Sequence, residues 1–346
     1  MLSNASTADR LDPDHSLIDS DPNCPADRQR TDLRTILCCP RCHGAVEQAG
    51  ARWICREVTC LYATVGFPVT QGQPVLVDFE TSIFDRASYE AGLGSVLPRD
   101  DSGRGLRTML RRAVLGHNTE AARMCDTLLH HLRREAARPR VLVLGGGAIG
   151  SGITALYEDP SIEVVGTDVY ASVNTQLVAD GHALPFQDGV FDAVIVQAVL
   201  EHVLEPQAVV NEIHRVLHPE GLVYADTPFM QQVHEAAFDF TRFTRSGHRW
   251  LFRRFDEIES GTVGGAGTAL LWSMRYYLRA FGVRNPVATI CVAPFFGLRW
   301  LERFARAAPN ADAASGHYFL GWRSDRQSVQ PKDMVTYYDR QTQARA

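Results

Sequence analysis

The sequence predicts an α/β fold built around a parallel sheet, and three features of residues 140–203 support this prediction. An apolar run, Val141–Leu144, leads directly into a glycine-rich stretch. A second apolar run ends in Asp168, and a third begins at Phe191. The expected order is therefore strand, glycine turn, helix, strand with an acidic end, loop and strand. This is the order of elements in the nucleotide-binding half of an α/β domain.

Three glycines, Gly145, Gly147 and Gly150, lie in the turn after the first predicted strand. Glycine tolerates a positive φ, and its missing Cβ lets a ligand lie against the backbone. Asp168 ends the next strand 18 residues after Gly150, where a carboxylate can accept hydrogen bonds from both ribose hydroxyls. The glycine spacing also fits a dinucleotide site or a purely structural turn, so the glycines alone do not select the ligand.

The residues after this stretch narrow the choice of ligand. Their pattern is Asp180, Leu184-Pro185-Phe186, Asp188, Phe191-Asp192 and then Val199-Leu200-Glu201-His202-Val203. From about Val141 to Asp226, the chain closely resembles the class I S-adenosylmethionine-dependent methyltransferases of the type 11-like group. The resemblance implies a Rossmann-like, seven-stranded methyltransferase sheet with helices on both faces, and S-adenosylmethionine as the cofactor.

The resemblance also implies roles for individual residues. In this family an acidic residue at the position of Asp180 lies beside the adenine amino group, and the run Val199–Val203 opens the helix that lines the methyl-donor pocket. The implied cofactor-binding residues are Gly145, Gly147 and Gly150 for the amino-acid end, Asp168 for the ribose, Asp180 and Gly181 for the adenine, and Gln197 at the end of the third apolar run. The family often has an acidic residue in the first strand, where this chain has Val143.

Four closely spaced cysteines predict a zinc site ahead of this domain. They are Cys39, Cys42, Cys55 and Cys60, in two short pairs separated by a strand-length segment. Four thiolates suit tetrahedral zinc, and zinc stabilises a module whose own core is small. Cys38 is the alternative to Cys39, which is preferred because Pro-x-Cys follows it directly. The surrounding pattern resembles the zinc-ribbon module of methyltransferase-activator proteins, which implies a structural or substrate-side role.

Length and composition set the expected domain organisation. The chain has 346 residues and is 45% apolar, enough for a sizeable core beside a small appendage. Its net charge of −5 gives no basic signal for nucleic acid. The eight cysteines cluster unevenly and no apolar secretory segment opens the chain, so a reducing cytoplasm is expected. The predicted segments are a disordered leader (1–32), the zinc-ribbon module (33–79), a linker with a basic helix (80–117), the methyltransferase domain (118–325) with a helical insert (264–308), and a polar tail (326–346).

Two helices are predicted around the start of the methyltransferase domain. The linker carries Arg107, Arg111 and Arg112 on a short helical pattern, which predicts either a solvated helix face or a clamp for an anionic group of the substrate. The second helix, over Thr119–Ala136 with Asn118 as its cap, has apolar residues at helical spacing. It is expected to pack beside the first strand.

Polar residues among aromatic ones follow the predicted fifth strand, Leu222–Asp226, and mark the acceptor side. They include His234, Asp239 and Arg242. Open α/β sheets bind ligands at the carboxyl ends of their strands. Asp239 and Arg242 are therefore the predicted substrate residues, and an i,i+3 pair on one helix turn is the alternative. The stretch resembles a segment of bacterial methyltransferases linked to cell-surface polysaccharide synthesis, which implies a saccharide or polyhydroxyl acceptor.

A long apolar insert, residues 264–308, lies between two further predicted strands at Phe255–Val263 and His317–Trp322. Its stretch Pro286–Leu298 carries almost no charge but is too short to span a bilayer. Three interpretations stay open: a lid, a homodimer interface, and a helix on the membrane surface through residues 286–306, which would suit a lipid-linked acceptor. The predicted location is the cytoplasm, with membrane association as the alternative.

Methyl transfer requires a positioned acceptor and a group that handles its proton, because the sulfonium cofactor supplies the electrophile. His202 and His234 are the candidate general bases, since imidazole titrates near neutral pH. For His202 and the adjacent Glu201, a role in shaping the pocket is the alternative. The predicted function is O-methylation of a saccharide or another small polyhydroxyl, free or lipid-linked, with a small-molecule or glycan acceptor as partner and no nucleic acid.

Two other functions stay open. An NAD-dependent oxidoreductase would use the Gly-x-Gly-x-x-Gly spacing, but it does not require the run from Asp180 to His202. A non-catalytic scaffold would bind the cofactor or another methyltransferase without turnover, and Val143 in place of an acidic residue keeps this alternative open.

Overall fold

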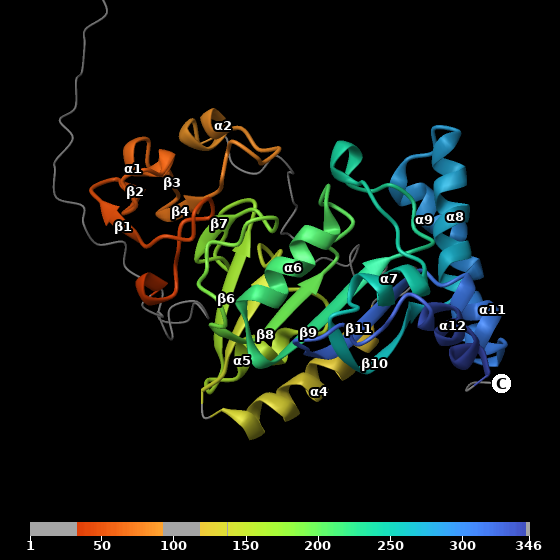
Figure 1. The fold of residues 1–346 in the computed structure, drawn as a ribbon. Coiled ribbons are helices and arrows are strands. Elements are labelled where there is room, and N and C mark those ends of the chain that lie inside the picture. The colour runs from red at the N-terminus through yellow and green to blue at the C-terminus, as the bar shows by residue number, and fades with distance from the viewer. Residues whose placement is uncertain (1–32, 93–117, 137, 344–346) are drawn as a thin grey trace, which may run out of the picture.

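A nine-stranded sheet forms the centre of the molecule (Figure 1). The computed structural model describes residues 33–92, 118–136 and 138–343. The strands of this sheet are β3 (Val69–Thr70), β4 (Gln73–Leu76), β5 (Arg140–Leu144), β6 (Glu163–Asp168), β7 (Leu177–Ala179), β8 (Phe191–Gln197), β9 (Leu217–Pro228), β10 (Phe255–Gly264) and β11 (Gly316–Arg323). Their spatial order is β10-β11-β9-β8-β5-β6-β7-β4-β3. A separate two-stranded sheet consists of β1 (Val46–Ala49) and β2 (Arg52–Cys55).

Strands β5 to β11 are the seven strands of a Rossmann-like methyltransferase sheet, which confirms the predicted fold class. From β7 through β6, β5 and β8 to β9, neighbouring strands pair in parallel. β11 then pairs antiparallel with both β9 and β10. The parallel pairing brings the carboxyl ends of five strands to one edge of the sheet.

The central strand β5 is covered on both faces. Leu142 and Leu144 belong to one apolar cluster, and Val141 and Val143 belong to another. Successive residues of a strand point to opposite faces, so a strand buried on both faces has an unbroken apolar run. The unbroken apolar run Val141–Leu144 therefore predicted β5 from the sequence.

Two helices supply most of this cover and lie on opposite sides of the sheet (Figure 1). One is α6 (Pro206–Val216), which begins with proline at a position where helices tolerate it. The other is α4 (Glu120–Glu135), which confirms the helix predicted there. The Asn118 side chain caps α4, because its Oδ1 accepts the N–H of Ala121 at 3.0 Å.

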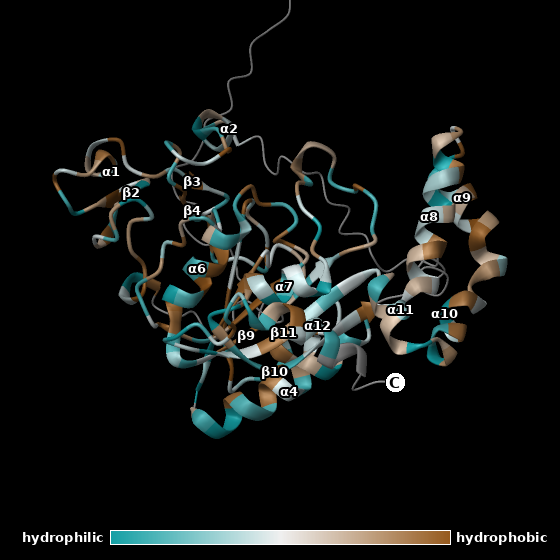
Figure 2. Cartoon of the chain, turned by 45° about the vertical axis from the view of Figure 1, so that its right-hand side comes forward, coloured by the Kyte–Doolittle hydropathy of each residue, from teal (hydrophilic) through white to brown (hydrophobic). Residues whose placement is uncertain are grey.

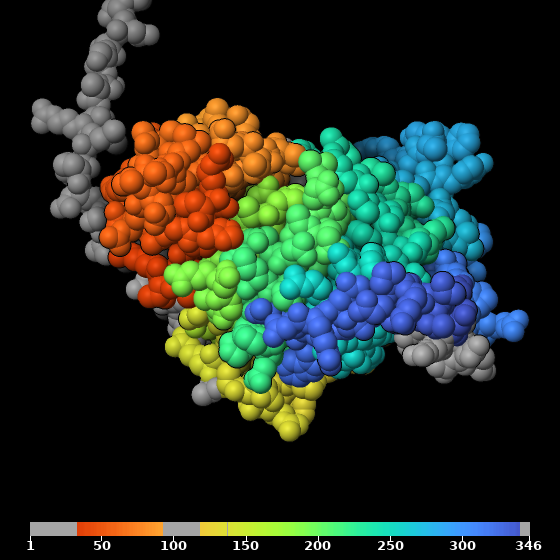
Figure 3. All heavy atoms as spheres, viewed as in Figure 1, coloured from red at the N-terminus to blue at the C-terminus, as the bar shows by residue number. Residues whose placement is uncertain are grey.

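The cysteine-bearing module is not a separate appendage, because its second hairpin extends the sheet. β4 pairs in parallel with β7, and β3 pairs antiparallel with β4. Leu37 also forms a bridge to Phe186, and both residues are buried. Figure 3 shows the red and orange module continuing directly into the green surface of the domain. The hairpin thereby covers an edge strand that would otherwise present unpaired backbone groups.

One predicted helix is short, and one local expectation was wrong. The helix after the glycine turn, α5, covers only Thr154–Glu158. Asp159 precedes a proline and is extended with ψ of 110°, because the proline ring disfavours the helical region for the residue before it. The run Val199–Val203 forms turns and does not open a helix, since α6 begins only at Pro206.

The predicted insert is a helical arm that stands beside the β10–β11 edge (Figures 1 and 2). It contains α8 (Ala266–Ala280), α9 (Asn285–Val292), η4 (Ala293–Phe295), α10 (Gly297–Leu301), η5 (Glu302–Phe304) and α11 (Ala307–Asp312). Its exposed large apolar side chains are Leu270, Tyr277, Phe281, Val287, Ile290, Phe295, Phe296, Trp300, Leu301 and Phe304. Within the described ranges, no helix is both long and apolar enough to cross a bilayer. Lid, dimer interface and membrane-surface contact all stay predictions.

The remaining elements are short. They are η2 (Leu33–Thr35), α1 (Leu61–Thr64), α2 (Arg86–Glu90), η3 (Ala236–Phe238), α7 (Arg245–Leu251) and α12 (Asp333–Gln343). The predicted leader and the predicted basic helix with Arg107, Arg111 and Arg112 lie outside the described residues.

We expect Leu37→Ala to destabilise the module and the domain together, because Leu37 is 1% exposed in the core that they share. A buried leucine truncated to alanine costs about 2–5 kcal/mol of unfolding free energy. Denaturant unfolding with hydrogen exchange resolved to β2 and β8 measures this. Leu61→Ala, the same change at a residue that is 40% exposed, is the control. Loss of protection in β2 alone would contradict the shared core.

Candidate active site

A cavity of about 520 Å³ opens where β5, β6, β8 and β9 end. Eight of the predicted site residues line it: Gly145, Gly150, Asp168, Asp180, Gly181, Gln197, His202 and His234. Three others, Gly147, Asp239 and Arg242, lie behind this lining. The parallel strands thus bring together residues that are up to 89 positions apart in the sequence (Gly145 to His234).

The glycine turn needs glycine for reasons that differ from one position to the next. Gly145 has a φ of +76°, and a Cβ there would lie 2.3 Å from Val199. A Cβ on Gly150 would lie 2.1 Å from Oε1 of Gln197. Gly147 does not line the cavity, but its N–H donates to Oδ2 of Asp168 at 2.8 Å and so holds that carboxylate. The turn is therefore a backbone cradle at one end of the cavity.

Asp168 ends β6 as a buried carboxylate at the cavity wall. Its Oδ1 accepts the N–H of Val169 at 2.7 Å, and its Oδ2 accepts the N–H of Gly147. These backbone donors hold the carboxylate in place. A carboxylate so fixed suits the two hydroxyls of a ribose.

Asp180 is the second buried carboxylate of the cavity, and its partners come from two parts of the chain. Its Oδ1 accepts Nδ1 of His182 at 2.6 Å, and its Oδ2 accepts the hydroxyl of Ser82. Burial alone would raise the pKa of Asp180, but these hydrogen bonds outweigh burial and hold the pKa below its ordinary value. Ser82 gave no sequence signal, because only the fold brings its segment to the cavity.

A polar network that sequence reasoning missed joins the glycine turn to β9. Oδ2 of Asp226 accepts Nε2 of Gln197 at 3.0 Å, Nδ2 of Asn118 at 2.8 Å and the hydroxyl of Tyr224 at 2.9 Å. Burial raises the pKa of Asp226. The sequence feature that could have predicted a role for Asp226 is its position near the carboxyl end of a strand, which it shares with Asp168. Oε1 of Gln197 is buried beside Gly150 and has no hydrogen-bond partner among the described residues.

Glu201 also lines the cavity and is fully buried. Neither of its carboxylate oxygens has a hydrogen-bond partner within the described part of the chain. Burial raises the pKa of Glu201 to about 8, and the charge of Asp226 adds to the rise. Asp168 and Asp180 have hydrogen-bond donors on both carboxylate oxygens, whereas Glu201 has none.

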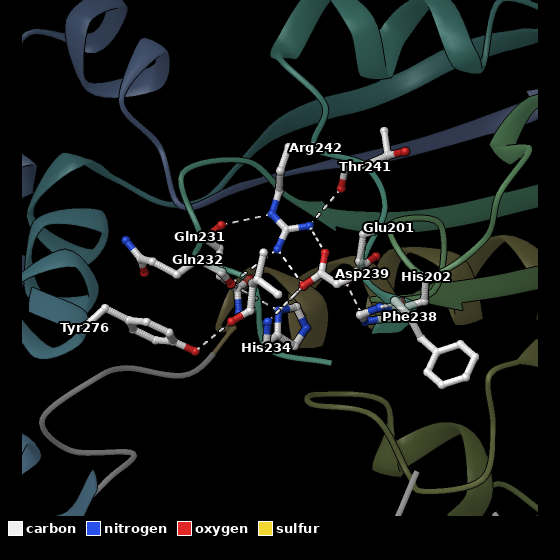
Figure 4. A network of polar contacts seen from close by, with 11 residues as sticks. Glu201, His202, Gln231, Gln232, His234, Phe238, Asp239, Thr241, Arg242 and Tyr276 are labelled. Atoms are coloured by element: carbon white, nitrogen blue, oxygen red, sulfur yellow. Dashed lines mark hydrogen bonds and ion pairs between the residues drawn. The ribbon is translucent and has the colours of Figure 1, made fainter. Parts of the chain in front are cut away.

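Two histidines lie beside Glu201 (Figure 4). Nδ1 of His202 lies 2.7 Å from the carbonyl oxygen of Phe238, and its Nε2 lies 3.6 Å from Oε1 of Glu201. The His202 and His234 ring centroids are 5.0 Å apart. Burial lowers the pKa of His202, which favours a neutral imidazole. The structure thus brings both predicted histidines to one wall of the cavity.

Asp239 and Arg242 form the i,i+3 pair that was the alternative, although the chain between η3 and α7 is irregular rather than helical. The pair is bidentate, and Nη2 donates to Oδ2 at 2.8 Å. Burial opposes ionisation of Asp239, but hydrogen bonds from Arg242 and from the His234 backbone lower its pKa to about 2. The same carboxylate lies 3.2 Å from Nδ1 of His234. Its visible role is to position His234, and direct substrate contact stays a prediction.

The four predicted cysteines form a cluster in the module. Their Sγ atoms all lie within 4.8 Å of one another, with Cys39 to Cys60 at 3.8 Å and Cys42 to Cys55 at 3.4 Å. Zn–S bonds of about 2.3 Å in a tetrahedron give sulfur separations of roughly 3.8 Å, so the cluster fits a zinc-ribbon module. Cys38, the alternative ligand, is outside the cluster and buried.

Among the comparisons with known proteins, one family matches part of the chain. The family described as "Methyltransferase domain" matches residues 143–225. No curated protein matches the chain.

Solved structures give only weak likenesses, which carry no argument about activity. Phosphoethanolamine N-methyltransferase 2 of Haemonchus contortus, in complex with S-adenosyl-L-methionine, has a TM-score of 0.41 and 14% identity over 65% of this chain and 59% of its own. A 1,6-didemethyltoxoflavin-N1-methyltransferase of Burkholderia thailandensis has a TM-score of 0.36 and 15% identity, over 69% of this chain and 85% of its own. The [4+2]-cyclase SpnF has a TM-score of 0.40 and 16% identity, over 68% of this chain and 89% of its own.

We expect Cys60→Ser to abolish zinc retention and Cys38→Ser to leave it unchanged, because only Cys60 belongs to the cluster. Losing one thiolate opens a site that needs four, and metal binding contributes directly to folding of such modules. Metal analysis after dialysis measures bound zinc, and a thermal melt reports the stability lost. Zinc loss in the Cys38 variant would assign the fourth ligand differently.

Proposed function

We propose that this chain, which carries a methyltransferase domain over residues 143–225, methylates an oxygen of a saccharide or another small polyhydroxyl with S-adenosylmethionine as donor. The acceptor is free or lipid-linked. The observation that carries the proposal is the cavity itself. It has a glycine cradle and two buried carboxylates on one side, and a carboxylate with two imidazoles on the other.

The residues on the donor side fit an adenosyl cofactor. A Cβ on Gly145 or Gly150 would close the cradle, as the contacts with Val199 and Gln197 show. Asp168 would hold the ribose, and Asp180 with Gly181 would border the adenine. Oε1 of Gln197, which has no hydrogen-bond partner among the described residues, would accept a hydrogen bond from the amino group of the cofactor. Gln197 would thereby take the role of the acidic residue that is common in the first strand of such domains and that Val143 replaces here. When bound, the cofactor supplies a methyl group on a positively charged sulfur.

The acceptor side has the groups that an alcohol requires. His202 and His234 line the cavity next to Glu201, and Asp239 holds the ring of His234. An alcohol must lose its proton as the methyl group arrives, and groups near neutral pKa assist this step. These histidines therefore orient the acceptor and ease the departure of its proton. Phe238 and Trp272 add apolar walls that suit the faces of a sugar ring.

The cysteine cluster supports a structural zinc ion. Its module pairs with β7, whose following residue is Asp180, and the segment after the module supplies Ser82 to that carboxylate. Zinc would therefore steady one wall of the donor pocket. Four thiolates leave no open coordination position for catalysis.

We expect Asp168→Asn to weaken S-adenosylmethionine binding by about 10–100-fold, because hydrogen bonds to a charged group are worth about 1.5–3 kcal/mol. Isothermal titration calorimetry of the whole chain measures this. Asp192→Asn, at the start of β8 and outside the cavity, is the control. Tight NAD binding without binding of S-adenosylmethionine would support the oxidoreductase instead.

We expect His202→Ala and His234→Ala each to lower methyl transfer by about 100-fold or more, the usual contribution of a group that handles a proton. Donor binding should stay intact. Transfer of labelled methyl to panels of sugars and glycolipids measures turnover. His218→Ala, an exposed histidine on β9, is the matched control. Full turnover in both cavity variants would remove the histidines from the reaction, and donor binding without any methylated product would favour the scaffold.

A further inference from the structure

The unpartnered carboxylate of Glu201 is the least explained feature of the cavity. Glu201 is 0% exposed, and its two oxygens find no hydrogen-bond donor on the described residues. Buried polar groups are nearly always hydrogen-bonded, and an uncompensated buried carboxylate costs several kcal/mol. Asp226, the neighbouring buried acid, has three side-chain donors on one oxygen. Glu201 therefore lacks a hydrogen-bond donor, and the nearest basic nitrogen, Nε2 of His202, lies 3.6 Å from its Oε1.

The two imidazoles beside Glu201 are oriented as metal ligands are. Nδ1 of His202 faces the carbonyl oxygen of Phe238 at 2.7 Å, and Nδ1 of His234 lies 3.2 Å from Oδ2 of Asp239. A nitrogen that faces a carbonyl or carboxylate oxygen carries the proton, so the lone pair is on Nε2 of each ring. Histidines that bind metals almost always donate their other N–H to such an acceptor.

The three side chains converge on one point. One ligand atom each from Glu201, His202 and His234 can be chosen so that all three lie within 4.8 Å of one another. Glu201 and His202 lie in the turns after β8, whereas His234 comes from the segment after β9. All three line the cavity, and Figure 4 shows them grouped beside the Asp239–Arg242 pair.

We propose that Glu201, His202 and His234 bind one divalent transition-metal ion at the acceptor side of the cavity. Two imidazoles and one carboxylate suit ions such as Zn²⁺, Co²⁺ or Fe²⁺ and leave coordination positions open toward the cavity. Asp239 and the Phe238 carbonyl then act as positioning groups, which hold the rings rather than touching the ion. The cation then supplies the partner that the buried carboxylate of Glu201 does not find among the described residues.

The role of this ion rests on the proposed methyl transfer. A hydroxyl oxygen in an open position has a lowered pKa and a fixed orientation. Its electron pair forms the new O–CH₃ bond, the S–CH₃ bond breaks with its pair going to sulfur, and the hydroxyl proton goes to water. The histidines thus act on the acceptor through the cation and not as free bases. Acceptors with two neighbouring hydroxyls, as in sugars, would offer two oxygens to the ion.

Cobalt titration of the whole chain tests the proposal after the cysteine cluster has been filled with zinc. We expect one further equivalent of Co²⁺, with weak visible bands and no thiolate-to-cobalt charge-transfer band. Glu201→Gln and His234→Ala should each weaken this binding by about 100-fold or more, and Asp239→Asn by about 10–100-fold. His218→Ala should leave it unchanged. His234 is exposed, so its variant should stay folded even if the Glu201 variant does not.

Several results would overturn the assignment. They are the absence of a second bound ion, a thiolate band that places cobalt in the cysteine cluster, and unchanged cobalt affinity in the His234 variant. Calorimetry with S-adenosylmethionine on the same preparation separates this inference from the proposed function. Donor binding without cobalt binding refutes the metal site alone. Cobalt binding without donor binding supports the site and refutes the methyl donor.

Discussion

The parallel pairing of β5 with β6 on one side and β8 on the other is the constraint on which the site depends. It places the glycine turn after β5, the carboxylate of Asp168 and the side chain of Gln197 at one edge of the sheet. The apolar cover on both faces holds these strands rigid, since the residues of β5 pack into two separate clusters. Short polar segments at the strand ends can therefore keep precise positions although they lie in turns.

The donor and acceptor sides differ in how their buried acids are satisfied. Asp168 and Asp180 are held by backbone and side-chain donors, and Asp226 is the centre of a small network. Glu201 has no such donors. A fold can tolerate a buried acid without a hydrogen-bond donor where a ligand supplies the missing partner, and buried groups with shifted pKa values gather at functional sites. The contrast separates a side of the cavity whose acids are already paired from a side where Glu201 has no hydrogen-bond donor.

The cysteine module contributes to the site through the sheet rather than as a separate domain. Its hairpin covers the edge at β7, and the chain that follows it returns to the cavity with Ser82 on Asp180 and with Ile83 and Phe84 in the lining. The stability of the module and the shape of the donor pocket are therefore linked. The helical arm lies at the opposite edge of the sheet (Figure 2), and several of its aromatic residues are exposed.

The sequence by itself determined the features that depend on neighbouring residues. Apolar runs marked the buried strands, glycines marked the turn, Asp168 marked a strand end, and the cysteine spacing marked the cluster. Only the tertiary structure decided which distant side chains meet: Ser82 with Asp180, Asn118 with Asp226, and Glu201 with His234. It also showed that Val199–Val203 is a turn. Local patterns record which side chains are buried and how the backbone turns, whereas contacts between distant segments depend on strand order and packing, which no single stretch of sequence contains.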